Sequence, residues 1–196
     1  MCGLPASTER RLVAIAGPPG AGKTTVARLA QSALENRGVS TGLLAMDGFH
    51  LDNAVLSQRG MLARKGAPET FDVAGFRSIL DRLRSEAEVA VPEFDRTSDQ
   101  VIAARSIVRS DQKTVIVEGN YLLLDEPVWR DLEQQWAHAV FLDVPFEKLE
   151  ERLIQRWLDH GLPPDAARVR ALENDIPNAR RVVENLNGHF IRLGGD

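Results

Sequence analysis

The chain has 196 residues, of which 43% are hydrophobic and 27% are charged, and its net charge is −4. This composition predicts one globular domain over residues 1–196, and the net charge gives no overall attraction to nucleic acid or to an anionic membrane. Cys2 is the only cysteine, so an intramolecular disulfide is excluded, and no apolar run reaches 18 residues. We therefore expect a cytoplasmic protein that is a monomer or a homodimer and has neither nucleic acid nor a membrane as a partner.

Apolar runs alternate with amphipathic segments along the chain, which predicts an α/β fold with a parallel sheet covered on both faces. After a short polar arm at residues 1–10, buried strands are expected at residues 12–16, 42–46, 114–117, 139–144 and 189–193. Helices are expected at residues 26–34, 72–83 and 147–160, from residue 163 onward, and at residues 181–186, with an amphipathic segment near 129–136. The broken pattern between residues 89 and 110 indicates two small strands around Pro92 and Arg96.

The segment Gly17-Pro18-Pro19-Gly20-Ala21-Gly22-Lys23-Thr24-Thr25 joins the first expected strand to the first expected helix. The pattern G-x-x-x-x-G-K-[ST] in this context is a P-loop, in which glycines allow backbone N–H groups to approach phosphate oxygens. The unpaired N–H groups and the dipole of the following helix also favour phosphate. Lys23 is expected to reach the β- and γ-phosphates of a nucleotide, and the Thr24 hydroxyl is expected to bind Mg²⁺. The simpler alternative is a glycine-rich turn that only begins a helix.

A P-loop does not define the reaction, so other motifs are needed. The Asn-Lys-x-Asp signature of guanine-binding domains is absent, as is an ABC-type signature. Residues 72–75 match the D-x-x-G pattern of GTPase switches, but they lie at an expected helix start without a buried strand before them. The size of the chain fits a small metabolite kinase.

Two carboxylates follow buried strands and are therefore expected at the edge of the sheet where open α/β folds bind ligands. Asp47 follows the second strand and Glu118 the third. Phosphoryl transfer to an alcohol requires a carboxylate that orients or accepts the hydroxyl proton, and a metal that holds the β/γ oxygens. We expect Lys23 and Mg²⁺ to keep both acids ionised. Alternatively, either acid caps a helix or pairs with a neighbouring arginine.

Three ordered motifs resemble the phosphoribulokinase/uridine kinase family of P-loop kinases. They are Met46-Asp47-Gly48-Phe49-His50-Leu51, then residues 64–72, and then Val117-Glu118-Gly119-Asn120-Tyr121. The segment around Lys65 is similar to bacterial pantothenate kinases, and also to fructokinase-like or nucleoside kinase-like bacterial proteins. The resemblance, which runs from about residue 11 to 193, implies a three-layer fold with a five-stranded parallel sheet in strand order 2-3-1-4-5. It also implies ATP with Mg²⁺, Asp47 as general base, and Glu118 near the metal.

By the same resemblance, an insertion at about residues 48–112 contributes the acceptor pocket. His50 is a candidate for a hydrogen bond to an acceptor hydroxyl, and Arg96 matches a substrate-side position in relatives. Arg59, Arg64 and Lys65 form a basic cluster that could bind an anionic acceptor, although a solvated run of charges is an equal alternative. Tyr121 is a candidate for stacking on a ring or sugar face.

Two arginines four residues apart, Arg152 and Arg156, are expected on one face of a lid at about residues 150–170. Lid arginines neutralise charge on the transferring phosphoryl group, so both are candidate catalytic residues together with Lys23 and Asp47. The alternative for Arg156 is a weak helical pair with Asp159.

These observations predict an ATP-dependent kinase that phosphorylates a hydroxyl of a sugar, a nucleoside or a pantothenate-like alcohol. Two alternatives stay open. A kinase for a phosphate acceptor would depend on Arg59 and Arg64 and would not need Asp47. A non-catalytic protein would use ATP only to order its lid and bind a partner.

Overall fold

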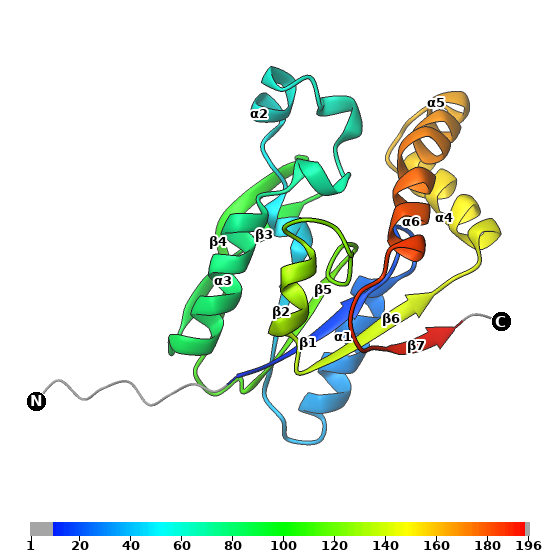
Figure 1. The fold of residues 1–196 in the computed structure, drawn as a ribbon. Helices are drawn as coiled ribbons and strands as arrows, with labels where there is room; N and C mark the ends of the chain where they lie inside the picture. Colours follow the sequence, from blue (N-terminus) through cyan, green and yellow to red (C-terminus); the bar gives the residue numbers. More distant parts are fainter. Residues whose placement is uncertain (1–9, 195–196) are drawn as a thin grey trace, which may run out of the picture.

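The computed structural model describes residues 10–194, and a five-stranded parallel sheet runs through its centre (Figure 1). Its strands are β1 (Arg11–Ala16), β2 (Thr41–Ala45), β5 (Thr114–Gly119), β6 (His138–Asp143) and β7 (Ile191–Gly194). Their spatial order is β2-β5-β1-β6-β7, and every neighbouring pair is parallel. Numbered along the chain among themselves, these strands follow the order 2-3-1-4-5, so the expected fold class is confirmed.

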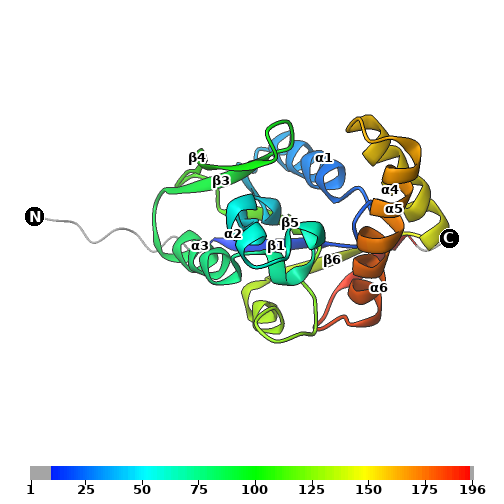
Figure 2. The ribbon, with the colours of Figure 1, turned by 90° about the horizontal axis from the view of Figure 1, so that it is seen from above.

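Helices cover both faces of the sheet (Figure 2). One face carries α1 (Lys23–Glu35) and α4 (Phe146–Asp159), and the other carries α3 (Val73–Ser85) and a 3₁₀ turn at Arg130–Gln135. This arrangement follows from strand geometry, because successive side chains of a strand point to opposite faces. On β1, Leu12 and Ala14 belong to the apolar cluster that includes α3, whereas Ile15 belongs to the cluster that includes α1 and α4.

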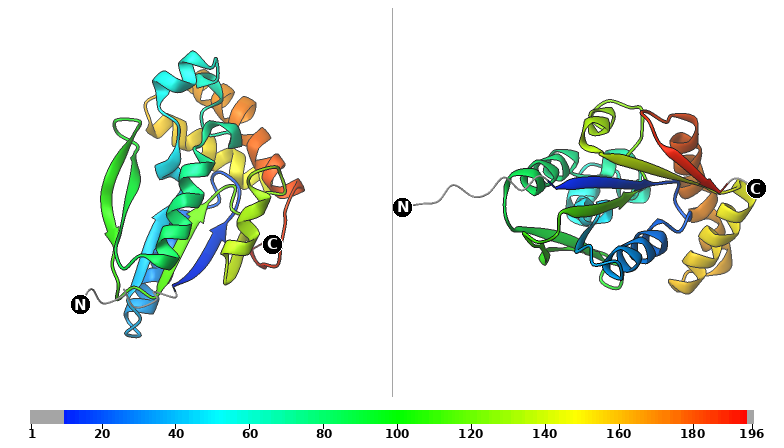
Figure 3. Two further views of the ribbon diagram at one scale, coloured as in Figure 1. Left: turned by 60° about the vertical axis from the view of Figure 1, so that its left-hand side comes forward. Right: turned by 90° about the horizontal axis from the view of Figure 1, so that it is seen from below.

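The chain between β2 and β5 forms an insertion beside the sheet. It contains α2 (Asn53–Gln58), α3, and an antiparallel hairpin of β3 (Val89–Asp95) and β4 (Gln100–Val108). The hairpin is a sheet of its own and stands apart from the central one (Figure 3, left). The two small strands expected around Pro92 and Arg96 are these, but Arg96 itself lies in the turn that joins them.

A single long helical run follows α4. It comprises α5 (Pro164–Arg170), a π-helical segment (Ala171–Asp175) and α6 (Ile176–Glu184) without a break. The expectation of two separate helices, one from residue 163 and one at residues 181–186, was therefore wrong. The polar residues between them do not form a solvent-exposed turn, because Asn174 and Asp175 are buried and hydrogen-bonded within the molecule.

The expected polar arm needs one correction. Residues 1–9, including Cys2, lie outside the described residues, but Arg10 is described and is only 5% exposed. Its guanidinium donates hydrogen bonds to backbone carbonyl oxygens in the two segments that precede β3 and β5. These bonds connect the beginning of β1 to both segments. Among residues 10–194, no helix is long and apolar enough to cross a membrane.

Candidate active site

A cavity of about 600 Å³ opens at the carboxyl ends of the parallel strands. The P-loop, the residues after β2 and β5, the hairpin turn and the helices α4 and α5 all contribute to its wall. Eight of the candidate residues from the sequence line this one cavity: Lys23, Asp47, His50, Lys65, Arg96, Glu118, Arg152 and Arg156. The cavity lies where an open α/β sheet is expected to bind its ligand.

The P-loop has the backbone conformation that its glycines permit. Gly20 and Gly22 have φ angles of +81° and +88°, in the left-handed region that residues with a side chain rarely adopt. The Lys23 side chain is buried and its Nζ donates to the Pro18 carbonyl at 2.9 Å, so it folds back over the loop. Burial lowers the pKa of Lys23 to about 8, against the opposing effects of Glu118 and Asp47. A phosphate would supply the negative charge that this buried ammonium needs.

The two candidate metal ligands, Thr24 and Glu118, are already in contact. Thr24 Oγ1 donates to Glu118 Oε1 at 2.9 Å, at the first turn of α1 and the end of β5. Mg²⁺ in phosphate-binding sites takes few protein ligands and completes its shell with phosphate oxygens and waters. The described residues hold no group of three or more His, Cys, Asp or Glu that could bind a metal alone, and a hydroxyl beside a carboxylate fits this mode of binding.

The surroundings of Glu118 do not all favour the ionised form, which we expected Lys23 and Mg²⁺ together to maintain. Glu118 is only 6% exposed, and burial raises its pKa above the usual value, with a further contribution from Asp47. Lys23 and the Thr24 hydrogen bond act in the opposite direction, but they do not outweigh the cost of burying the charge. A cation bound between Thr24 and Glu118 would favour the ionised carboxylate.

Asp47 lies in a 3₁₀ turn (Met46–Phe49) directly after β2, on the cavity wall. Arg96 in the hairpin turn reaches across the cavity, and its Nη2 is 3.0 Å from Asp47 Oδ2. The pair is partly exposed to solvent, so it links the hairpin to the end of β2 without closing off the carboxylate.

Beyond Asp47, the cavity is lined by His50, Lys65 and Phe94. The His50 ring packs against Phe71 and Phe94, and its Nδ1 donates to the Asp47 carbonyl at 2.8 Å. Burial lowers the pKa of His50, so the neutral ring persists at neutral pH. All three Lys65 ammonium protons are used, by Asn53 Oδ1 at 2.7 Å and by the carboxylate and carbonyl of Asp99 at 2.9 and 3.0 Å.

A close backbone approach holds the hairpin over this side of the cavity, and it gives a testable prediction. A Cβ atom on Gly48 would lie 2.6 Å from the Pro92 carbonyl oxygen, a backbone atom that cannot move alone. We expect Gly48→Ala to displace the hairpin, and Arg96 with it, at a cost of about 1–3 kcal/mol in unfolding free energy. Urea denaturation measures the cost.

Gly42→Ala is the comparison for this prediction, because its Cβ would meet the end of the Val108 side chain at 3.1 Å instead of backbone. We expect a smaller loss of stability for Gly42→Ala. Equal losses for the two variants would contradict a specific role for the Pro92 contact.

The lid arginines lie on α4 and reach the cavity differently. Arg152 is exposed, and its Nη1 donates to the Gly20 carbonyl at 3.2 Å. Arg156 is half-buried, and its Nε is buried without a hydrogen-bond partner among the described residues. Burial, and then the like charge of Arg96, lower the pKa of Arg156. The Asp159 carboxylate accepts a hydrogen bond from the Gln155 side chain, and not from Arg156 as the alternative from the sequence had it. An anion in the cavity would add to the attraction that Asp175 and Asp47 exert on this guanidinium.

Two candidates for substrate contact do not reach the cavity. Tyr121 is fully buried, its hydroxyl donates to the Gly66 carbonyl at 2.5 Å, and its ring packs against Phe71 and Trp129. It supports the cavity wall from behind, so the expectation that it stacks on an acceptor was wrong. Arg59 follows α2 and is exposed away from the cavity, so the basic cluster does not act as a unit.

Several residues of the cavity were not predicted. They are Asp99, Asn120, Trp157, Arg170 and Asp175. Asp99 is the partner of Lys65, and Trp157 carries the Arg170 guanidinium 5.2 Å from its ring centroid. Asn120 belongs to the third motif of the resemblance, and Arg170 lies at the end of the expected lid, but neither was expected in the cavity. The other three become part of the cavity only through contacts between distant segments.

Comparison with known proteins agrees with this geometry. A family model described as "AAA domain" matches residues 13–162. The chain belongs to this family. A candidate fructose transport system kinase from Silicibacter sp. TM1040 is 45% identical in sequence to this chain. Its crystal structure matches the present fold with a TM-score of 0.92, and the match covers 97% of this chain and 92% of that one.

Curated relatives point in the same direction. The uncharacterised protein YggC of Escherichia coli is 36% identical over 90% of this chain and 74% of its own length. A candidate uridine kinase of Schizosaccharomyces pombe is 30% identical over 91% of this chain and 80% of its own. The pantothenate kinase of Corynebacterium glutamicum is 32% identical over 79% of this chain, which spans only 48% of that protein. The resemblance to the phosphoribulokinase/uridine kinase group of P-loop kinases is thereby confirmed.

Proposed function

We propose that this P-loop kinase transfers the γ-phosphoryl group of ATP to a hydroxyl of a small metabolite. The observation that carries the proposal is the shared cavity. The phosphate-binding loop, the Thr24–Glu118 pair and the Asp47 carboxylate all face the same space. This arrangement supplies a phosphate site, a metal site and a base within reach of one another.

Each residue has a part in the proposed reaction. The P-loop amides and Lys23 hold the phosphates, while Thr24 and Glu118 would hold Mg²⁺, which would supply positive charge beside the phosphates. Asp47 accepts the hydrogen bond of the acceptor hydroxyl and orients its oxygen for in-line attack. Arg152 and Arg156 place positive charge above the transferring group. Arg96 pairs with Asp47 and so fixes the position of this carboxylate on the cavity wall.

The charges on the acceptor side favour an uncharged acceptor. Lys65 is neutralised by Asp99, and Arg96 is paired with Asp47, so neither cation is without a counter-charge. An anionic acceptor would have to compete with these carboxylates, whereas hydroxyl groups can exchange hydrogen bonds with them. A sugar or a nucleoside fits this environment better than a pantothenate-like carboxylate. The name of the Silicibacter relative, a candidate fructose transport system kinase, supports a sugar.

The two alternatives have less support. A phosphate acceptor was expected to depend on Arg59 and Arg64. Arg59 lies outside the cavity. Arg64 forms an ion pair with Glu69, in which Nη2 of the arginine is 2.5 Å from Oε1 of the glutamate. A non-catalytic protein that binds ATP only to order a lid would not need a carboxylate placed at the open end of the phosphate site.

The proposal is tested by measuring ADP release with Mg·ATP and pools of sugars, nucleosides and vitamin alcohols. We expect release above the background ATPase rate with a neutral polyhydroxy acceptor, and loss of that release in Lys23→Ala. Arg59→Ala is the matched control, because it removes a cation that lies outside the cavity, and its rate should equal that of the wild type. Release with nucleoside monophosphates alone, or with no pool at all, would contradict the proposal.

A further inference from the structure

The π-helical segment Ala171–Asp175 places two consecutive polar side chains in the interior. Asn174 is 8% exposed and Asp175 is 9% exposed. Short π segments inside α-helices often occur at functional sites, because they are less stable than the regular helix and persist where they position a side chain.

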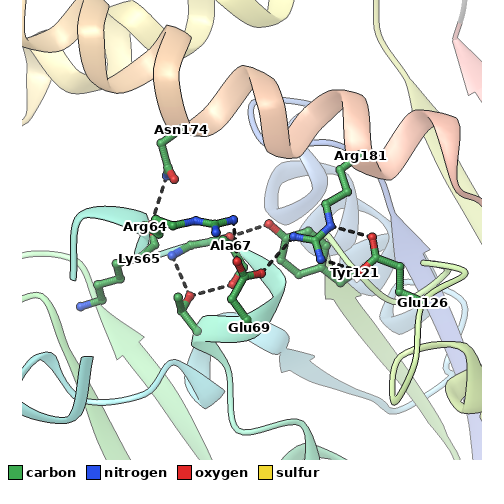
Figure 4. A network of polar contacts seen from close by, with 10 residues as sticks. Arg64, Lys65, Ala67, Glu69, Tyr121, Glu126, Asn174 and Arg181 are labelled. Atoms are coloured by element: carbon green, nitrogen blue, oxygen red, sulfur yellow. Dashed lines mark hydrogen bonds and ion pairs between the residues drawn. The ribbon is translucent and has the colours of Figure 1, made fainter. Parts of the chain in front are cut away.

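Asn174 reaches the acceptor side of the cavity. Its Nδ2 donates to the Lys65 carbonyl at 3.2 Å, and Nη2 of Arg170 donates to the same oxygen at 2.9 Å (Figure 4 shows the Asn174 bond). Arg170 also donates through Nη1 to the Ala63 carbonyl. We name residues 62–66 the acceptor loop, since Leu62, Lys65 and Gly66 line the cavity.

Asp175 reaches the nucleotide side. Its Oδ2 accepts from the indole Nε1 of Trp157 at 2.6 Å. Trp157 lies on α4 next to Arg156, and both line the cavity together with the P-loop. The two adjacent residues therefore contact two different segments that line the cavity: Asp175 contacts α4 and Asn174 contacts the acceptor loop.

Other contacts also hold the acceptor loop. Arg181 on α6 pairs with both Glu69 and Glu126, and Tyr121 donates to the Gly66 carbonyl (Figure 4). Toward the tip, Leu62 is 44% exposed, and the amides of Arg64 and Lys65 bond only to carbonyls of the same short turn. Asn53 and Asp99 hold the Lys65 side chain, whereas Arg170 and Asn174 are the side chains of the α5–α6 run that bond to the backbone carbonyls of the tip.

We propose that Arg170 and Asn174 are positioning residues that couple nucleotide binding under α4 to the placement of the acceptor loop. This inference rests on the proposed function, because it requires a nucleotide in the cavity. A nucleotide that contacts Arg156 fixes α4, and Trp157 and Asp175 then fix the π segment that holds the Lys65 carbonyl. Because coupling between two sites is reciprocal, an acceptor held by the loop tightens nucleotide binding by the same factor.

Hydrogen exchange of residues 62–66 with and without Mg·AMPPNP tests the coupling without knowledge of the acceptor. In the wild type we expect the nucleotide analogue to slow exchange by about tenfold, within the usual range of coupling between sites. Asn174→Ala should abolish this protection while its affinity for Mg·AMPPNP, measured by calorimetry, stays within about threefold of the wild-type value. Asn185→Ala is the matched control. It removes the same side-chain amide from the end of α6, where that amide donates only to the Arg181 carbonyl.

A second variant tests the same coupling in case Asn174→Ala does not fold. Trp157→Phe keeps an aromatic ring at this position but removes the N–H bonded to Asp175, and it should also abolish the nucleotide-dependent protection. Binding of Mg·AMPPNP without protection in the wild type, or protection that persists in both variants, would overturn the coupling and leave the proposed function standing. No binding of Mg·AMPPNP at all would overturn both.

Discussion

Asp47→Asn is expected to lower kcat by about 10²–10⁴-fold, the usual contribution of a positioned general base. The amide has nearly the same shape as the carboxylate, but it cannot accept the hydroxyl proton. The P-loop amides, Lys23 and Thr24 are unaffected, so the Kd for Mg·ATP should stay within about threefold of the wild-type value. Steady-state ADP release with the acceptor found in the pooled screen measures the first quantity, and calorimetry measures the second.

Asp99→Asn provides the matched comparison, because it is the same substitution in the same cavity. Asp99 neutralises Lys65 and is not the carboxylate that faces the phosphate site, so its loss should raise the acceptor KM and leave kcat within about threefold. Wild-type turnover in Asp47→Asn would remove Asp47 from the mechanism and favour a phosphate acceptor. Equal losses of kcat in both variants would indicate a general electrostatic effect in place of a base.

The sequence was sufficient for those parts of the fold that depend on local pattern. Buried apolar runs predicted the strands, and because the strands are parallel, residues that follow them had to meet at one edge of the sheet. This is why the residue pattern alone could place Asp47 and Glu118, 71 positions apart, in the same cavity as Lys23. The P-loop required only its own residues and the flanking strand and helix.

The remaining parts depend on contacts between distant segments, which no local pattern encodes. Tyr121 follows a buried strand as Glu118 does, but its side chain faces the aromatic cluster instead of the cavity. Arg59 lies near Lys65 in sequence, yet only the Lys65 side chain points inward, where it forms an ion pair with Asp99 of the hairpin turn. Asn174 lies in a polar stretch of the sequence, and its burial follows from its hydrogen bond to the Lys65 carbonyl, which lies 109 positions earlier in the chain.

Arg10 shows the same limitation at the level of stability, since a charged residue ahead of a strand is usually solvated. Its guanidinium instead donates to five backbone carbonyls, those of Leu83, Glu86, Ala87, Arg109 and Gln112. We expect Arg10→Ala to lower the free energy of unfolding by about 3–5 kcal/mol, because it leaves several part-buried carbonyls without a donor and opens a space at the start of β1. Chemical denaturation with fluorescence detection measures the change.

Arg11→Ala is a close control, since Arg11 is the next residue of the chain and its side chain is exposed. Its effect should stay within about 0.5 kcal/mol, the usual range for surface substitutions. Arg10→Lys should fall between the two, because an ammonium keeps the charge but offers three donors to carbonyls that a planar guanidinium contacts from several directions. If Arg10→Ala and Arg11→Ala cost the same, the carbonyl cluster does not contribute to stability in the way its geometry indicates. In that case the anchoring of β1 must come from the apolar contacts of Leu12 and Ala14.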